Sequence, residues 1–147
     1  MKTRTLASIL IFILAVVIIA GSGTKKKRIS DEDLTNAYTG TWINSDYVYK
    51  PKMVLYTGKW ELYNMKREKP VCYGEIELME KWIDSNGDIF FEYGWECMNH
   101  GTVGYELVKI SDSGNTMERL YTEGRMRVEE WDLDSIYYTY RIYYRQE

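Results

Sequence analysis

The sequence is poor in the residue types that most often carry chemistry. It contains one histidine and two cysteines among 147 residues. His100 lies between Asn99 and Gly101 in an apparent turn, and no serine lies in a nucleophile elbow, so no set of nucleophile, base and orienting group is evident. Cys72 and Cys97 are too far apart for a CxxC redox or zinc motif. We therefore expect no enzymatic activity, no cofactor and no metal.

Two acidic stretches resemble oxygen-ligand sites without meeting their requirements. The stretch 84–88 reads Asp-Ser-Asn-Gly-Asp, but Trp95 stands where an EF-hand loop requires its twelfth-position glutamate. A hairpin turn explains this stretch better. Glu129, Glu130, Asp132 and Asp134 form a second cluster, which we interpret as solvated loop charges rather than a low-affinity site for a divalent ion.

A long basic stripe is also missing. The formal net charge is −3, and removal of residues 1–22, which contain Lys2 and Arg4 and no acidic residue, would make it −5. An acidic domain of this kind is a poor nucleic-acid binder. The one basic cluster, at 25–28, is short and isolated, and we interpret it as a solvated linker rather than a nucleic-acid patch.

Proline is rare, and the rest of the chain is rich in strand-forming residues. Pro51 and Pro70 are the only prolines, and each falls at a predicted strand entrance, where a missing N–H is tolerated. Tyrosine, tryptophan and β-branched residues favour pleated, half-buried surfaces, and Gly, Asn, Asp and Ser clusters mark turns. We expect eight strands near 39–46, 52–57, 59–66, 71–83, 88–97, 103–110, 116–122 and 136–146.

The N-terminal residues have the pattern of a targeting segment. Lys2 and Arg4 precede an apolar run from Leu6 to Ala20, which is followed by small residues. This pattern is typical of a secretory signal, although an uncleaved membrane anchor is the alternative because the run is only slightly shorter than a spanning helix. We divide the chain into a signal or anchor (1–22), a basic and polar linker (23–37) and a β domain (38–147). The linker's positive charge leaves the membrane topology open.

The two cysteines lie on neighbouring predicted strands. If the hairpin turns about Asp84-Ser85, Cys72 faces Cys97, Gly74 faces Trp95, Ile76 faces Tyr93 and Leu78 faces Phe91, which brings like residues together. A disulfide is then within reach and would indicate an oxidising, extracytoplasmic compartment. Two buried free thiols are the alternative.

Gly40-Thr41-Trp42 opens the first predicted strand, and the last predicted strand ends near Arg145. This Gly-x-Trp motif resembles the signature of the lipocalin and wider calycin group. The resemblance implies an all-β, eight-stranded antiparallel up-and-down barrel, in which Trp42 packs beneath the barrel against an arginine of the last strand. Arg145 is the nearest candidate, and Arg141, on the same face, is the alternative. The resemblance also implies binding of small hydrophobic molecules.

We expect this barrel to bind a small lipophilic or amphipathic ligand in the cell envelope. The predicted lining combines apolar and aromatic side chains of the central strands, as in many ligand pockets, and comprises Ile76, Leu78, Phe91, Tyr93, Trp95, Tyr105 and Leu107. The first alternative is a filled barrel that acts as a protein-interaction module through its tyrosine-rich surface. An enzyme of the same shape is the third possibility, for which no polar constellation is apparent.

Overall fold

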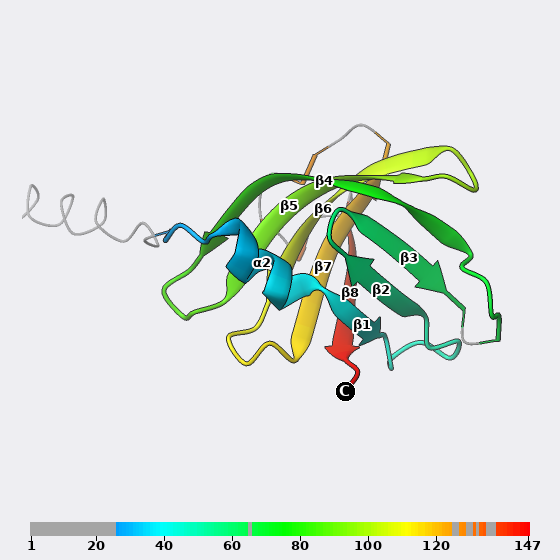
Figure 1. Cartoon of the computed structure of the whole chain (residues 1–147), viewed down its shortest axis with the longest axis horizontal. Helices are drawn as coiled ribbons and strands as arrows, with labels where there is room; N and C mark the ends of the chain where they lie inside the picture. Colours follow the sequence, from blue (N-terminus) through cyan, green and yellow to red (C-terminus); the bar gives the residue numbers. More distant parts are fainter. Residues whose placement is uncertain (1–25, 65, 125–126, 129–130, 132, 135–137) are drawn as a thin grey trace, which may run out of the picture.

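Eight antiparallel strands form a closed barrel in which each strand pairs with the next and the last pairs with the first. The computed structural model describes residues 26–64, 66–124, 127–128, 131, 133–134 and 138–147 (Figure 1). The strands are β1 (Gly40–Ile43), β2 (Lys52–Tyr56), β3 (Lys59–Tyr63), β4 (Cys72–Ile83), β5 (Ile89–Cys97), β6 (Thr102–Ile110), β7 (Thr116–Glu123) and β8 (Thr139–Arg145).

This architecture confirms the predicted all-β, eight-stranded up-and-down barrel. The strands start and end close to the predicted positions because alternating side chains and turn residues are local signals. The predicted signal or anchor lies outside the described residues. In the part of the chain that is described, no helix has the length and apolar character needed to cross a membrane.

A short helix, α2 (Asp31–Tyr38), precedes the barrel and was not predicted. Ser30 caps it, since its Oγ accepts a hydrogen bond from the Asp33 backbone N–H at 3.0 Å, and three acidic residues in its first turn suit the helix dipole. Leu34 and Tyr38 lie one turn apart and are both buried in the barrel core. Residues 31–37, assigned from the sequence to a linker, therefore help to close one end of the barrel.

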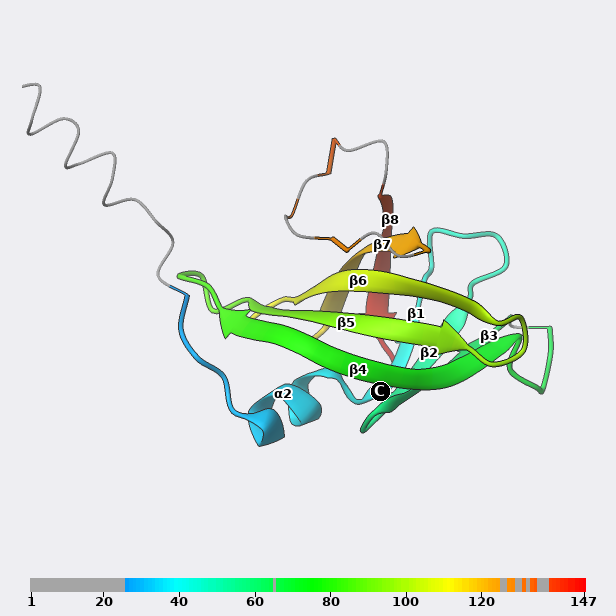
Figure 2. The same cartoon turned by 90° about the horizontal axis from the view of Figure 1, so that it is seen from above.

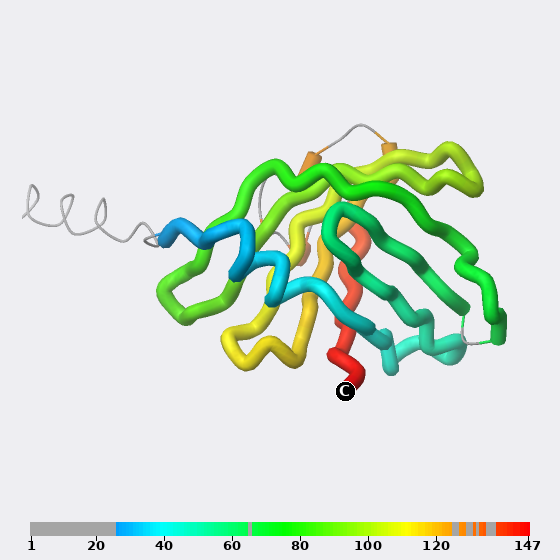
Figure 3. Tube along the Cα trace, in the orientation of Figure 1, coloured from blue at the N-terminus to red at the C-terminus, as the bar shows by residue number. Residues whose placement is uncertain are grey.

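The closed end of the barrel is densely packed around Trp42. The Trp42 indole N–H donates to the Tyr38 backbone oxygen at 2.9 Å, and the Tyr38 ring lies 5.5 Å from that of Phe91. Figure 3 shows the C-terminal end of β8 arriving beside β1, where Trp42 and Arg145 are paired. Of the two arginines considered, Arg145 makes the predicted contact, with its Cζ 4.5 Å from the Trp42 ring centroid.

The β4–β5 hairpin has a different register from the predicted one. Ile76 faces Trp95 and Leu78 faces Tyr93, a shift of two residues, and a bulge follows between Leu78 and Lys81. The turn lies further along the chain than expected, because Asp84 Oδ1 accepts the backbone N–H groups of both Asn86 and Asp88 and Gly87 adopts a positive φ of 88°. A two-residue shift leaves each side chain on its face, so alternation could not detect it.

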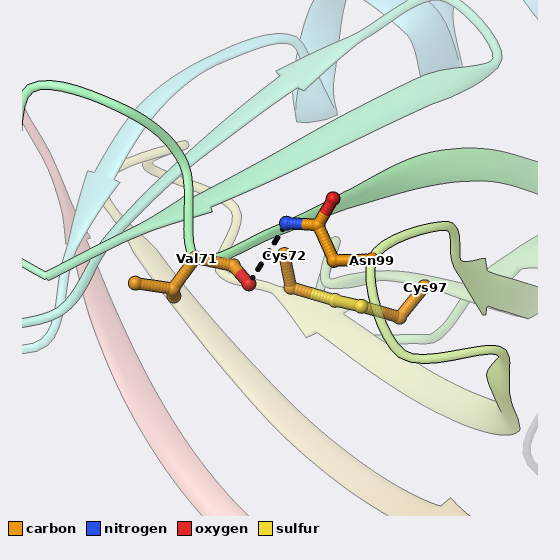
Figure 4. Close-up of a disulfide and its surroundings, with 4 residues drawn as sticks. All are labelled: Val71, Cys72, Cys97 and Asn99. Atoms are coloured by element: carbon orange, nitrogen blue, oxygen red, sulfur yellow. Dashed lines mark hydrogen bonds between the residues drawn. A yellow bond between two sulfur atoms is a disulfide. The ribbon is translucent and has the colours of Figure 1, made fainter.

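The predicted disulfide is present despite this shift. Cys72 and Cys97 are bonded, with their Cα atoms 5.6 Å apart. Figure 4 shows the bond joining the start of β4 to the end of β5, beside a hydrogen bond of 3.2 Å from the Asn99 side-chain amide to the Val71 backbone oxygen. A bond of this kind is typical of proteins in oxidising compartments.

A second apolar cluster lies on the outer wall of the barrel. Figure 2 shows β4, β5 and β6 side by side in this wall. Val128, from the segment after β7, packs against Leu107 and Leu120, and Trp131 contacts Phe90 with ring centroids 5.8 Å apart. Arg127 adds an ion pair to Glu92 at 2.5 Å. Arg127, Val128 and Trp131 thus lie against the outer wall of the barrel.

Candidate functional site

The barrel contains an interior cavity of about 400 Å³ towards the end opposite α2. The loops 44–51, 64–71 and 98–101 follow β1, β3 and β5, so antiparallel topology places them together at this open end. The closed end is filled by the buried side chains of Trp42, Tyr38 and Leu34. The lining combines apolar and charged side chains: Tyr47, Pro51, Met53, Trp60, Leu62, Cys72, Trp95, Cys97, His100, Thr102, Glu106, Arg119, Tyr121, Glu123, Arg141 and Tyr143.

A buried ion pair forms one wall of the cavity. Glu106 on β6 and Arg119 on β7 lie diagonally across this strand pair, since Tyr121 is the partner of Glu106 and Val108 that of Arg119. Glu106 and Arg119 are only 3% and 5% exposed. Arg119 Nε donates to Glu106 Oε2 at 2.6 Å, a second bond joins Arg119 Nη2 to Glu106 Oε1, and the Tyr93 hydroxyl donates to Glu106 Oε2 at 2.6 Å. Such a bidentate pair with an additional donor compensates part of the desolvation cost of its charges.

The electrostatics of this group keep its members in fixed protonation states. Burial by itself lowers the pKa of Arg119, but the attraction of Glu106 outweighs it and the net pKa is raised well above its ordinary value. Burial, together with the charge of Glu106, raises the pKa of Tyr93 well above 10.0. The tyrosine therefore remains a neutral donor and the arginine a cation at ordinary pH, which does not suit proton transfer.

Arg141 is the cation of the lining that has no carboxylate partner. It lies opposite Arg119 on the β7–β8 pair, donates from Nη1 to the Tyr140 backbone oxygen at 2.8 Å, and lies over the Tyr47 ring with Cζ 4.7 Å from the centroid. Among the described residues no carboxylate lies within ion-pair distance of it. Glu123, the other carboxylate of the lining besides Glu106, is exposed.

Two tryptophans in the cavity wall have unpartnered indole N–H groups. Trp60 and Trp95 make an edge-to-face contact with centroids 5.6 Å apart, and within the described chain the buried Nε1 atom of each has no hydrogen-bond partner. An unsatisfied buried donor costs about 1 to 3 kcal/mol.

Glycines at two positions make room for these rings. Gly104 faces Trp95 across the β5–β6 pair, and an added Cβ there would lie 2.5 Å from Trp95 Cζ2. Gly74 faces Trp60 across the β3–β4 pair. The Trp95 indole thus lies over a glycine, but that glycine is Gly104. The predicted Gly74–Trp95 pair is wrong because the β4–β5 register is shifted.

The structure separates the seven residues predicted to line the interior. Trp95 lines the cavity, whereas Ile76, Phe91 and Tyr93 belong to the packed core around it. Leu78 is 38% exposed next to the bulge. Tyr105 and Leu107 were predicted to face the interior, but both lie on the outer face of the barrel, so this prediction is wrong.

The reason for this error lies in the two covered faces of β6. Val108 and Ile110 face inwards and are buried in the core, while Leu107 is buried on the outer face beneath Val128. Apolar residues thus occur on both faces, and the inward position before Val108 carries Glu106, which is paired with Arg119. The charge of Glu106 at an inward position was the sequence signal that this face is not purely apolar. Its burial is explained only by its ion pair with Arg119 on β7.

The remaining predicted features have ordinary structural roles. Residues 84–88 form the hairpin turn described above, and His100 is exposed in the β5–β6 turn at the edge of the cavity. Glu129, Glu130 and Asp132 lie outside the described residues. Within the described part of the chain, no group of three or more His, Cys, Asp and Glu side chains is placed to hold a metal ion.

Comparison with protein-family models, with characterised proteins and with solved structures gives no match.

Proposed function

We propose that the barrel binds, non-covalently, a small amphipathic molecule with an anionic head group, in an extracytoplasmic compartment. The observation that carries the proposal is the interior cavity of about 400 Å³ with Arg141 in its wall, where Arg141 forms no ion pair with a carboxylate of the described residues. This volume is within the range of small-molecule sites, which is about 300 to 1,000 Å³. The disulfide supports the compartment.

The chemistry of the lining supports an amphipathic rather than a purely apolar ligand. Met53, Leu62 and the indole rings provide an apolar surface, and the guanidinium of Arg141 provides charge-assisted donors. The cavity gives less support to the alternative of a filled barrel that acts only through its surface.

The proposal is tested with a fluorescent polyene fatty acid and the corresponding polyene alcohol. We expect the fatty acid to bind to the protein, in the form that cells produce, with Arg141→Gln weakening it by about 10- to 100-fold, as for loss of a charged hydrogen bond. The alcohol should bind with nearly the same affinity to both proteins. Arg28→Gln, which changes an exposed arginine outside the cavity, is the matched control.

Native mass spectrometry of the same preparation adds an independent measurement. It should detect a bound molecule that is lost from the Arg141→Gln variant, and the mass of the chain distinguishes a cleaved signal from a retained anchor. Failure to bind any member of a broad lipid panel, with Arg141→Gln behaving as the unchanged protein, would contradict the proposal. A protein recovered by crosslinking in cells would then favour the interaction module.

A further inference from the structure

The loop between β1 and β2 presents apolar side chains to solvent at its tip. Val48 is 92% exposed and Tyr49 57% exposed, and Tyr47 beside them is also exposed. Val48 is the most exposed of the large apolar side chains among the described residues. Three consecutive exposed residues of this kind form a patch whose burial by a partner is favourable.

The loop is ordered by hydrogen bonds that hold the tip outwards. Asn44 is buried at its base, where its backbone N–H donates to the Pro51 oxygen at 3.0 Å and its side-chain oxygen accepts the Asp46 N–H at 3.0 Å. The Lys50 N–H donates to the Tyr47 oxygen at 2.8 Å, and Lys50 has a positive φ of 39°. The turn therefore displays Val48 and Tyr49 at its two central positions, where they cannot pack on the barrel.

Basic side chains surround this apolar tip. The ranges 44–52 and 64–71 contain five basic residues and two acidic ones, although the chain as a whole has a net charge of −3: Lys50, Lys52, Lys66, Arg67 and Lys69 against Asp46 and Glu68. Lys66 Nζ lies 5.6 Å from the Tyr49 ring centroid, so the two loops are neighbours. Figure 3 shows both loops on the side of the molecule away from α2.

We propose that this tip, with the basic residues of the two loops, docks onto an anionic lipid bilayer. Tyrosine suits the bilayer interface because it combines an apolar ring with a polar hydroxyl, and the Val48 side chain would enter the apolar boundary. Each basic residue near an anionic surface strengthens binding by about fivefold. Charge complementarity thus favours a bilayer, which offers a continuous anionic surface and an apolar layer in one partner.

The docked tip would bring the cavity to the membrane. Tyr47 and Pro51 belong both to this loop and to the cavity lining, so an amphipathic molecule could pass between bilayer and barrel without crossing water. The docking itself does not depend on the proposed function, because Val48, Tyr49 and the basic residues lie outside the cavity lining. A barrel that binds no ligand could still dock.

Hydrogen–deuterium exchange with vesicles tests the docking at the level of single loops. The protein is used as cells produce it, with vesicles of phosphatidylcholine alone or of phosphatidylcholine and phosphatidylglycerol. We expect the second kind alone to slow exchange in residues 45–50 and 66–70, and added salt to reverse the effect by screening. The turn at 111–115, at the other end of the barrel, serves as the internal reference and should keep its exchange rate. Binding through a retained N-terminal anchor would not by itself protect residues 45–50.

Two variants sharpen this test. Val48→Asp should abolish the local protection, whereas Met79→Asp, at an exposed apolar position in the middle of β4, should leave it unchanged. Circular dichroism checks that both variants are folded. The combined change Lys66→Gln and Lys69→Gln should weaken vesicle binding by about 25-fold, from two losses of about fivefold. The proposal is overturned if vesicles with phosphatidylglycerol give no protection, or if they protect Val48→Asp as much as the unchanged protein. Crosslinking of Lys66 to a protein in cells, with no effect of vesicles, would overturn it as well.

Discussion

The guanidinium of Arg145 lies over the indole of Trp42, with Cζ 4.5 Å from the ring centroid, at the seam where β8 meets β1. Only two pairs of Cα partners join these strands, fewer than at any other strand pair of the barrel. Arg145 adds hydrogen bonds from Nε to the Gly114 oxygen at 2.9 Å, from Nη1 to the Thr39 oxygen at 3.2 Å, and from Nη2 to the Ala37 oxygen. The shortest seam is therefore reinforced by side chains.

Removal of the Trp42 indole should destabilise the fold strongly. Trp42 is fully buried among Tyr38, Met53 and other core residues, and Trp42→Ala should lower the free energy of unfolding by about 3 to 5 kcal/mol through lost burial and a residual cavity. Urea denaturation measures the change. Tyr144→Ala, at an outward-facing position next to Arg145, is the control and should change stability by less than about 0.5 kcal/mol. A near-neutral result for Trp42→Ala would show that Trp42 does not close the barrel end.

The buried Glu106–Arg119 pair should show strong coupling. Glu106→Leu or Arg119→Met alone leaves a buried charge without its partner, and each should cost about 3 to 5 kcal/mol. The double variant replaces both charges by apolar groups and should be more stable than either single variant. A double-mutant cycle by urea unfolding measures the coupling, and additive effects would contradict a desolvated pair.

Stability should fall at alkaline pH because of buried tyrosines. Burial raises the pKa of Tyr93 well above 10.0 in the folded chain, and burial raises that of Tyr143 as well. In the unfolded chain such hydroxyls lose their protons near pH 10, so above that pH the native state holds more protons than the unfolded state. The free energy of unfolding then decreases with rising pH, by up to about 1.4 kcal/mol per pH unit for each such tyrosine.

Urea unfolding at several pH values above about pH 9 measures this slope. Tyr93→Phe should reduce it, because the hydroxyl that resists ionisation is removed. Tyr73→Phe, at an exposed position on β4, should leave the slope unchanged. A slope that is the same in Tyr93→Phe as in the unchanged protein would mean that Tyr93 ionises as easily in the folded chain as in the unfolded one.

Loss of the Cys72–Cys97 bond should destabilise the open end of the barrel. The bond joins residues separated by 25 positions, and removing a crosslink across a loop of this length should cost about 2 to 4 kcal/mol. Unfolding of Cys72→Ser/Cys97→Ser, compared with the unchanged protein with and without reductant, measures the loss. Reductant should have no effect on the double variant, and a sensitive double variant would assign the effect to something other than this bond.

The positions of the strands follow from the sequence because their signals are local. Tyrosine, tryptophan and β-branched residues mark the strands, and turn residues mark the ends of β4 and β5. The antiparallel order of a meander then places the ends of the first and last strands together, which makes the Trp42–Arg145 contact possible. The α2 helix was missed although Ser30 and the acidic residues after it form a capping signal, because the basic residues just before it suggested a linker.

Tertiary structure alone decided how the strands are offset and what their two faces contact. At Ile76 and Leu78 the pairing of β4 with β5 is shifted by two residues, which keeps these side chains on the same face, so the pattern of residues there is equally compatible with either register. Leu107 and Val108 are both buried because Val128 packs on Leu107 at the outer wall, and no periodicity distinguishes an inward from a covered outward position. The Glu106–Arg119 pair and the cavity beside Arg141 likewise depend on which side chains meet across the barrel, a long-range relation that local sequence does not contain.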